Sequence, residues 1–376
     1  MIAASVRITL AAVDDIDAIE AAWRALELEA APSFFQSWTW VGCLAAERFP
    51  EPVLLRAERD GRTVGLALFN RVRSRLGIER LWLNESGDPT MDAVYTEHNG
   101  VLLALDAGDL LPACLDAMFT APIASREYPA RSWAWVRRLH FAGVDPAHLF
   151  AARRSGGVRR LRESAAPFVN LAALPAPPDA YLASLSANTR YQIRRSNRTF
   201  ARLGPLEVRE AQSLSEALAF LDALAKVHQH TWTLRGLPGA FSNPAFLRFH
   251  RALVARALPR REVALLRIAS GPHLLGYLYN FRLGDRVFTY QSGIDYEGVA
   301  VLIGRHAKPG LTCHHAAILR ARAEGAAVYD FLAGPDRYKT SLARDVRPLY
   351  WFEGAPSVSS LRMGFPSLRS GQSRRS

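Results

Sequence analysis

Long apolar runs are absent from this chain of 376 residues. No stretch of about 18 consecutive apolar residues occurs, which excludes an ordinary membrane-spanning helix. The first residues lack a charged start followed by a long apolar core, and an acidic residue arrives at Asp14, so we expect no signal peptide. Residues 357–376 are polar and are expected to form a disordered tail.

Cysteine is also scarce. The three cysteines, Cys43, Cys114 and Cys313, lie far apart, so they form neither a disulfide framework nor the spacing of a metal site. The sequence has no HExxH, CxxC, phosphate-loop or GxGxxG motif, which argues against metal and dinucleotide chemistry. We therefore expect a cytoplasmic protein without a bound metal.

Lysine is the rarest basic residue. Only Lys226, Lys308 and Lys339 occur, beside 44 arginines, and the net charge is +12. Such an excess attracts polyanions such as nucleic acid, anionic lipid or a phosphate-bearing cofactor, although a solvated basic surface explains it as well. Because lysine is so uncommon here, the two lysines beside turn signals in the last quarter are candidates for a site.

Two stretches of the chain repeat each other. The segment Leu54–Arg71 lies on Leu265–Arg282 without a gap, and both read as strand, turn and strand. We therefore expect a duplication into two similar α/β halves. Three prolines near residues 175–178 interrupt any regular element, so we predict a domain over 1–172 and a second over 173–356.

The second half predicts a strand, a crossover helix and another strand. Arg286–Asp295 is aromatic and β-branched, Leu311–Glu324 has helical spacing, and Val328–Leu332 is a short apolar run. The segment between Asp295 and Leu311 is expected to be a loop. This order predicts a parallel strand pair with a right-handed connection.

Two turns in this half carry candidate site residues. Lys308 and Gly310 stand where the chain enters the predicted helix, an arrangement that suits a pyrophosphate, although proline and glycine are also common at ordinary helix starts. Tyr338 and Lys339 follow the last strand, at the sheet edge where α/β proteins place ligands. There Tyr338 can donate a proton and Lys339 can hold an anion; the alternative is a packed tyrosine beside an exposed lysine.

Histidines and arginines supply further candidates. His228 and His230 can each act as a general base, though neither has a visible partner. Cys313 lies near a helix start, where a thiol pKa can fall, but no third group is evident. Arginines recur every four residues along one predicted helix, as a stripe that binds a cofactor phosphate, a phosphorylated acceptor or tRNA, or is merely solvated. These arginines are Arg190, Arg194, Arg198 and Arg202.

The order of these motifs resembles a known family. From Gly325 to Lys339 the chain reads G-x-x-x-Y-D-F-L-x-G-x-x-x-Y-K, preceded by Lys-Pro-Gly and a helix. With the aromatic-rich stretch Phe34–Leu44 and the basic helix upstream, it resembles the CelD/FemAB-type branch of the GNAT acyltransferases. That resemblance implies tandem GNAT-like α/β domains with mixed central sheets over nearly the whole chain.

The resemblance also implies where a cofactor binds. It implies CoA-dependent acyl transfer in the second domain, with Tyr338 and Lys339 beside the cleft and with the region of His228 and His230 facing the acceptor. The implied cofactor contacts are Gln291, Ser292, Gly293, Ile294, Arg305, Lys308, Gly310 and Leu311. One position departs from the family pattern, because Lys308 stands where the first glycine of the pyrophosphate loop is usual.

Three functions remain open from the sequence. The first is transfer of an acyl group, in the simplest case acetyl, from acetyl-CoA or another acyl-CoA to an amine or hydroxyl of a small-molecule or saccharide acceptor related to the cell envelope. The second replaces acyl-CoA with aminoacyl-tRNA, as in FemAB-type relatives. The third is a non-catalytic module that binds RNA or another anion, for which a steep salt dependence is expected.

Overall fold

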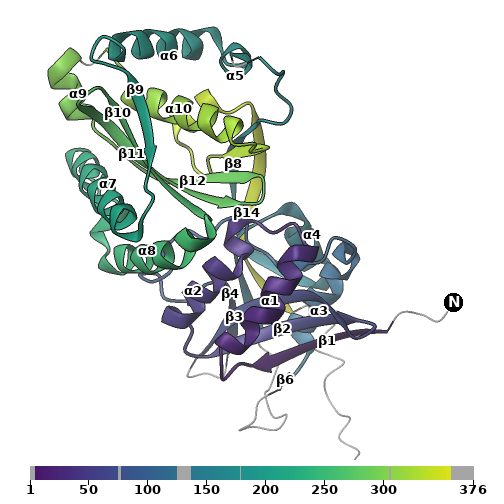
Figure 1. The fold of residues 1–376 in the computed structure, drawn as a ribbon. Coiled ribbons are helices and arrows are strands. Elements are labelled where there is room, and N and C mark those ends of the chain that lie inside the picture. Colours follow the sequence, from purple (N-terminus) through teal and green to yellow (C-terminus); the bar gives the residue numbers. More distant parts are fainter. Residues whose placement is uncertain (1–4, 75–77, 125–136, 178, 305, 357–376) are drawn as a thin grey trace, which may run out of the picture.

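The structure, a computed structural model, describes residues 5–74, 78–124, 137–177, 179–304 and 306–356. The predicted tail over 357–376 lies outside these residues. Helices pack on a sheet that runs through both lobes of the molecule (Figure 1). Within the described part of the chain, no helix combines the length and the apolar character needed to cross a membrane.

The first half contains a mixed set of strands and helices. Its elements are β1 Val6–Ala12, α1 Asp17–Glu29, α2 Trp38–Arg48, β2 Pro52–Arg59, β3 Arg62–Arg73, β4 Glu79–Leu83, β5 Leu102–Leu103, α3 Leu111–Thr120, β6 Ile123–Ala124, β7 Arg137–Val144, α4 Pro146–Ser155 and β8 Gly156–Asn170.

The second half repeats much of this order. Its elements are α5 Ala180–Ser184, α6 Ala187–Phe200, β9 Leu206–Glu210, α7 Leu214–Leu234, α8 Pro244–Ala257, β10 Val263–Ser270, β11 His273–Leu283, β12 Arg286–Ile294, α9 Tyr296–Ile303, α10 Pro309–Ala323, β13 Val328–Asp330, α11 Arg337–Leu342 and β14 Asp345–Pro356.

The predicted equivalence of the two hairpins is confirmed by their register. Leu54 pairs with Leu68 in β2–β3, and Leu265 pairs with Tyr279 in β10–β11, each 211 residues later. Both ladders shift register at the corresponding step, after Ala57 in the first half and after Ile268 in the second. A bulge inserts a residue and bends the strand, so a shared bulge indicates a shared framework.

The two halves also exchange strands. The sheet runs in the order β6-β1-β2-β3-β4-β7-β14-β8-β13-β12-β11-β10-β9, with β5 beside β3. The last strand, β14, lies between β7 and β8 of the first half, while β8 pairs with β13 of the second. The sheet therefore continues past the expected division at residues 172 and 173, which remains a proposal.

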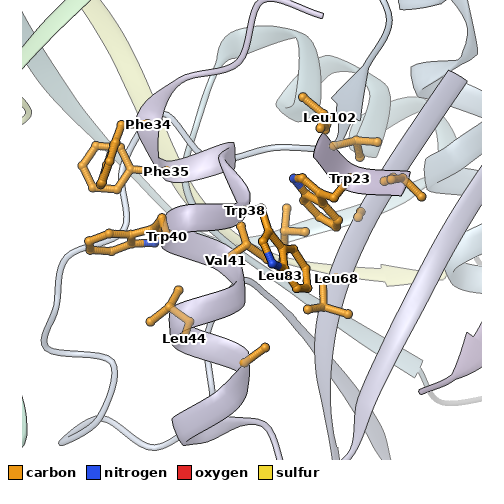
Figure 2. Packing of buried hydrophobic residues seen from close by; sticks show 14 of the residues in the cluster. Trp23, Phe34, Phe35, Trp38, Trp40, Val41, Leu44, Leu68, Leu83 and Leu102 are labelled. Atoms are coloured by element: carbon orange, nitrogen blue, oxygen red, sulfur yellow. The ribbon is translucent and has the colours of Figure 1, made fainter. Parts of the chain in front are cut away.

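Aromatic residues join the halves. Ser37 caps α2 by accepting the backbone N–H of Trp40. The ring of Phe34 stacks on Phe281 of β11, with 4.2 Å between centroids, and Trp40 meets Phe249 of α8 edge to face. Figure 2 shows this segment with Trp23, Trp38 and Leu44 packed along the same core.

The predicted elements of the second half are present with modest shifts. The expected strand over Arg286–Asp295 is β12, the helix is α10, and the last strand, β13, is shorter than predicted. The loop prediction for residues 296–310 was incomplete, because Tyr296–Ile303 forms α9. Asp295 caps that helix by accepting the backbone N–H of Gly298, a local signal that the loop reading overlooked.

Candidate active site

A cleft opens where two parallel strands separate. β12 pairs with β13 only from Arg286 to Phe288, and then continues to Ile294 with β11 on its other side. The resulting cleft has a volume of about 490 Å³. Its walls come from β12, α7, the turn after β13, α11 and a segment of the first half near Tyr95.

The turn after β13 is held in a demanding conformation. Leu332 has φ of 60°, a left-handed value that branched side chains seldom adopt. Asp330, fully buried, accepts the Leu332 N–H at 2.8 Å, and its other oxygen lies 3.2 Å from His98 Nε2. Burial opposes ionisation of Asp330, but His98, Arg347 and the Leu332 N–H together hold its pKa below the usual value.

Lys339 ties the same turn from the other side. Its ammonium donates to the carbonyl of Ala333 at 2.6 Å and to that of Leu332 at 3.4 Å, and it lies 3.9 Å from Asp336. The residue is buried and lines the cleft, and burial lowers its pKa. The exposed-lysine alternative therefore does not describe Lys339.

Tyr338 lines the cleft and packs against two rings. It stacks on His314 with 5.0 Å between centroids and meets Phe331 edge to face. Burial raises the pKa of its hydroxyl, so the group keeps its proton at neutral pH. Burial also lowers the pKa of His314 to about 3, so the stacking partner is neutral.

Of the two candidate histidines, His228 lies in the cleft and His230 does not. His228 is buried, and its Nδ1 donates to the Ser292 carbonyl of β12 at 2.9 Å. Burial lowers the pKa of His228, which favours the neutral ring. His230 is exposed on the far side of α7, with Nε2 2.6 Å from Glu297.

The candidate cofactor residues take different places. Gln291, Ser292 and Ile294 line the cleft. Gly293 instead packs against α7, since a Cβ there would lie 2.6 Å from the Leu224 carbonyl oxygen. Leu311 lies in the first turn of α10, and Arg305 falls outside the described residues.

The start of α10 is partly covered. The backbone N–H of Lys308 donates to Ser196 Oγ of α6 at 2.9 Å, and the Thr312 hydroxyl donates to Asn197. A Cβ on Gly310 would meet the Tyr296 hydroxyl at 2.9 Å. The Lys308 side chain is exposed, so it offers charge to a phosphate, whereas its own N–H is already engaged.

Three arginines of the predicted stripe lie on α6, and Arg202 lies in the turn that follows it. Arg194, Arg198 and Arg202 are exposed and form no ion pair within the described ranges, whereas Arg190 donates to the carbonyls of Ala183 and Leu185. Cys313 is buried, and burial raises its thiol pKa, which removes the case for a reactive thiolate. No cluster of three metal-type ligands occurs among the residues that the structure describes.

Sequence reasoning missed the contribution of the first half. Tyr95 and Glu97 line the cleft, although both precede its other walls by more than a hundred residues. Burial raises the pKa of Glu97 to about 7, despite the Ala333 N–H, Lys339 and His98 that favour its charged form. The left-handed φ values of Tyr95 (51°) and His98 (46°) mark this segment in the structure, but no sequence pattern announces them.

Comparisons with known proteins agree with this geometry. Residues 187–340 match the family model of the acetyltransferase (GNAT) domain. Among curated proteins there is no match.

Several solved structures are similar over most of the chain. The crystal structure of FemX has a TM-score of 0.60 at 10% identity, over 95% of this chain and 99% of its own. A conserved protein of unknown function from Bacteroides thetaiotaomicron VPI-5482 has a TM-score of 0.51 at 10% identity, over 92% and 99%. At such identities the likeness shows the fold alone. Residues 187–340 are thus similar to the acetyltransferase (GNAT) domain, in a chain whose α/β fold is similar to that of FemX over nearly its whole length.

Proposed function

We propose that the cleft transfers an acyl group, in the simplest case acetyl, from acyl-CoA to an amine or hydroxyl of a saccharide or related cell-envelope acceptor. The observation that carries this proposal is the separation of β12 and β13 beside Tyr338 and Lys339. Acyl-CoA, which GNAT domains generally use, supplies an activated thioester. The CelD-type assignment, the envelope acceptor and a cytoplasmic location belong to the same proposal.

The donor arm suits the exposed edge of β12. Gln291, Ser292 and Ile294 line the cleft, and beyond Phe288 the strand has no partner on the β13 side among the described residues, so an extended arm can lie along this edge. One of these groups, the Ser292 carbonyl, already accepts from His228. The start of α10 contains Lys308, Gly310 and Leu311. The Lys308 N–H already donates to Ser196, so the ammonium of Lys308 would bind a phosphate in its place.

The reacting end of the donor falls near the turn after β13. Tyr338 keeps its proton at neutral pH and can give it to the departing thiolate. Lys339 fixes the turn through two carbonyls, so its role is positioning. His228 holds β12, while His230 stays outside the cleft and takes no part in the proposed reaction.

The alternative donor is aminoacyl-tRNA, as the FemAB-type resemblance implies. The exposed arginines of α6 favour this donor, because α6 lies beside the start of α10. Ser196 and Asn197 of α6 accept hydrogen bonds from that helix start. A covered helix start also suits a donor that does not present a pyrophosphate there. Binding of tRNA should weaken steeply with salt, whereas one acyl-CoA in a cleft should depend on salt only weakly.

Ligand-induced stabilisation tests the donor. We expect acetyl-CoA, a longer acyl-CoA or free CoA to raise the melting temperature of the full chain, because a ligand that binds only the folded state stabilises it. Lys308→Ala should weaken acyl-CoA binding by about 1–3 kcal/mol, measured by calorimetry. No stabilisation by any CoA compound, with salt-sensitive tRNA binding, would favour the aminoacyl donor; tRNA binding without transfer would favour a binding module.

A further inference from the structure

The cleft contains a buried carboxylate that the second half does not provide. Glu97 belongs to the first half and lines the cleft with 8% of its surface exposed. The two nearby carboxylates of the second half are placed differently. Asp330 lies fully buried beneath the turn, bound to the Leu332 N–H and beside His98 and Arg347. Asp336 lies at the rim, with 53% of its side chain exposed.

We propose that Glu97 is the general base of the acyl transfer, so that the active site is complete only with both halves of the chain. This inference rests on the proposed function. Removal of the acceptor's proton is thereby assigned to a residue outside the region, 187–340, that matches the GNAT domain.

The geometry around Glu97 prepares one oxygen for this task. Its Oε2 accepts the Ala333 N–H at 2.5 Å, while the carbonyl of the same residue accepts from Lys339 at 2.6 Å. Glu97 and Lys339 therefore hold the same residue, Ala333, through its N–H and its carbonyl. The second carboxylate oxygen, Oε1, makes no hydrogen bond among the described residues and is available to an acceptor in the cleft.

The charges that face Glu97 come from four elements. His98, its neighbour in sequence, and Lys339 of α11 favour the ionised form. Asp330 of β13 opposes it, and Tyr290 of β12 lies close enough for the Glu97 charge to raise the tyrosine pKa. Burial outweighs the attractions, and the Glu97 pKa of about 7 leaves both protonation states populated near neutral pH.

His228 is less suited to be the base. Its Nδ1 donates to the Ser292 carbonyl, and its Nε2 is shut away between Trp232 and Phe241 with no partner in the described structure. Burial lowers its pKa, which weakens it as a proton acceptor. His228 is therefore a positioning residue that anchors β12.

The step balances with groups that are present. The acceptor nitrogen or oxygen attacks the thioester carbonyl, and its proton passes to Glu97 Oε1. The new C–N or C–O bond forms, the carbonyl oxygen takes up and returns the electron pair, and the C–S bond breaks. The thiolate takes the Tyr338 proton, and Tyr338 recovers a proton from the protonated Glu97 through solvent in the cleft.

A ligand-free measurement tests the carboxylate itself. The pKa of Glu97 is higher in the folded chain than in the unfolded one, so wild type loses stability relative to Glu97→Gln as pH rises from about 4.5 to 7. We expect the melting temperature of Glu97→Gln to exceed that of wild type by a margin that widens between pH 5 and pH 8. A constant margin would overturn the proposal, because Glu97 would then not titrate in this range.

Kinetics test the role in transfer. Thiol release from acetyl-CoA, with glucosamine as the acceptor probe, should fall about 10²–10⁴-fold in Glu97→Gln, and the rise of rate with pH should disappear. His228→Gln and Asp336→Asn should each keep that rise. Loss of the rise in His228→Gln, with its retention in Glu97→Gln, would overturn the assignment. If calorimetry finds no acetyl-CoA bound by any of these proteins, the donor proposal fails, while the melting curves still decide whether Glu97 is a poised base.

Discussion

The two halves treat the same strand junction in opposite ways. In the second half β12 and β13 share three residue pairs, and six further residues of β12 run past the contact into the cleft. In the first half the corresponding strands, β4 and β7, stay paired from Glu79 to Trp82, and β4 ends one residue later. A shared framework thus holds an open junction in one half and a closed one in the other.

Two buried asparagines fill the closed junction. Asn99 donates to the Leu83 carbonyl at 3.0 Å and accepts from Asn84 at 2.8 Å, while its backbone N–H donates to Gly143 of β7. Beside them, Trp82 stacks on His140 with 3.6 Å between centroids. Asn99 thus bridges the ends of β4 and β7, the strands that correspond to β12 and β13.

The segment that closes one junction also completes the other. The segment from Val94 to Asn99 runs from the edge of the second-half cleft to the closed junction, and it brings Tyr95 and Glu97 into that cleft. The Tyr290 hydroxyl of β12 donates to the Val94 carbonyl and fastens the segment to the second half. The comparison therefore indicates that the first half, whose own junction is closed, supplies side chains to the cleft of the second half.

The largest expected effect is a loss of stability when the aromatic contact between the two halves is removed. Trp40→Ala removes a ring that packs on Phe249 and Phe281, and we expect the free energy of unfolding to fall by about 3–5 kcal/mol. Denaturant unfolding measures this loss. Leu28→Ala, at an 89% exposed position on α1, is the control and should change little. A loss in Trp40→Ala no larger than in the control would mean that the aromatic joint does not hold the halves together.

The next effect is confined to the open junction. Tyr338→Phe keeps the ring on His314 and removes the hydroxyl, so we expect turnover to fall about 10²-fold with unchanged acyl-CoA affinity. Steady-state kinetics and calorimetry separate the two quantities. Tyr191→Phe, at an exposed tyrosine of α6, should behave as wild type. Full turnover in Tyr338→Phe would leave the residue a packing role only.

A smaller effect on turnover is expected from a change in the closed junction. Asn99→Ala removes two buried hydrogen bonds, which should cost about 1–3 kcal/mol of stability. Because the same segment carries Glu97, we also expect turnover to fall while acyl-CoA affinity stays near wild type. Asn188→Ala, at an exposed site on α6, is the control. Lower stability with unchanged turnover would show that the closed junction and the cleft are independent.

The smallest effect is expected outside both junctions. His230 and Glu297 form an exposed pair, with about 60% of each side chain in solvent. Exposed pairs contribute little, so His230→Ala should change stability by less than about 0.5 kcal/mol and leave turnover near wild type. Kinetics at several pH values check this. A marked loss of turnover would restore His230 as a candidate base.

The sequence predicted the parts that depend on local pattern. The ungapped match between Leu54–Arg71 and Leu265–Arg282 gave both hairpins, because strand alternation and turn residues act over a few positions. The exchange of β8 and β14 was not predictable in this way. Their pairing joins Phe168 to Asp345, and no local pattern records such a partner.

The same limit applies to the site. Tyr338 and Lys339 were recognised because they follow a short strand and a turn in one continuous stretch. Glu97 stands 236 residues before its hydrogen-bond partner Ala333, so only the packed structure brings them together. The burial of Lys339 was not predictable either, because its ammonium donates to the carbonyls of Leu332 and Ala333 in a turn where Leu332 has a left-handed φ.

Hydrogen exchange with acetyl-CoA tests most directly whether one junction is open to the donor and the other closed. We predict that the ligand slows amide exchange in residues 289–294 of β12 and in the turn at 331–339, and leaves residues 79–83 of β4 unchanged. Protection of β4 on binding would contradict the account, as would calorimetric binding without any protection in β12. Either result would place the donor outside the cleft between β12 and β13.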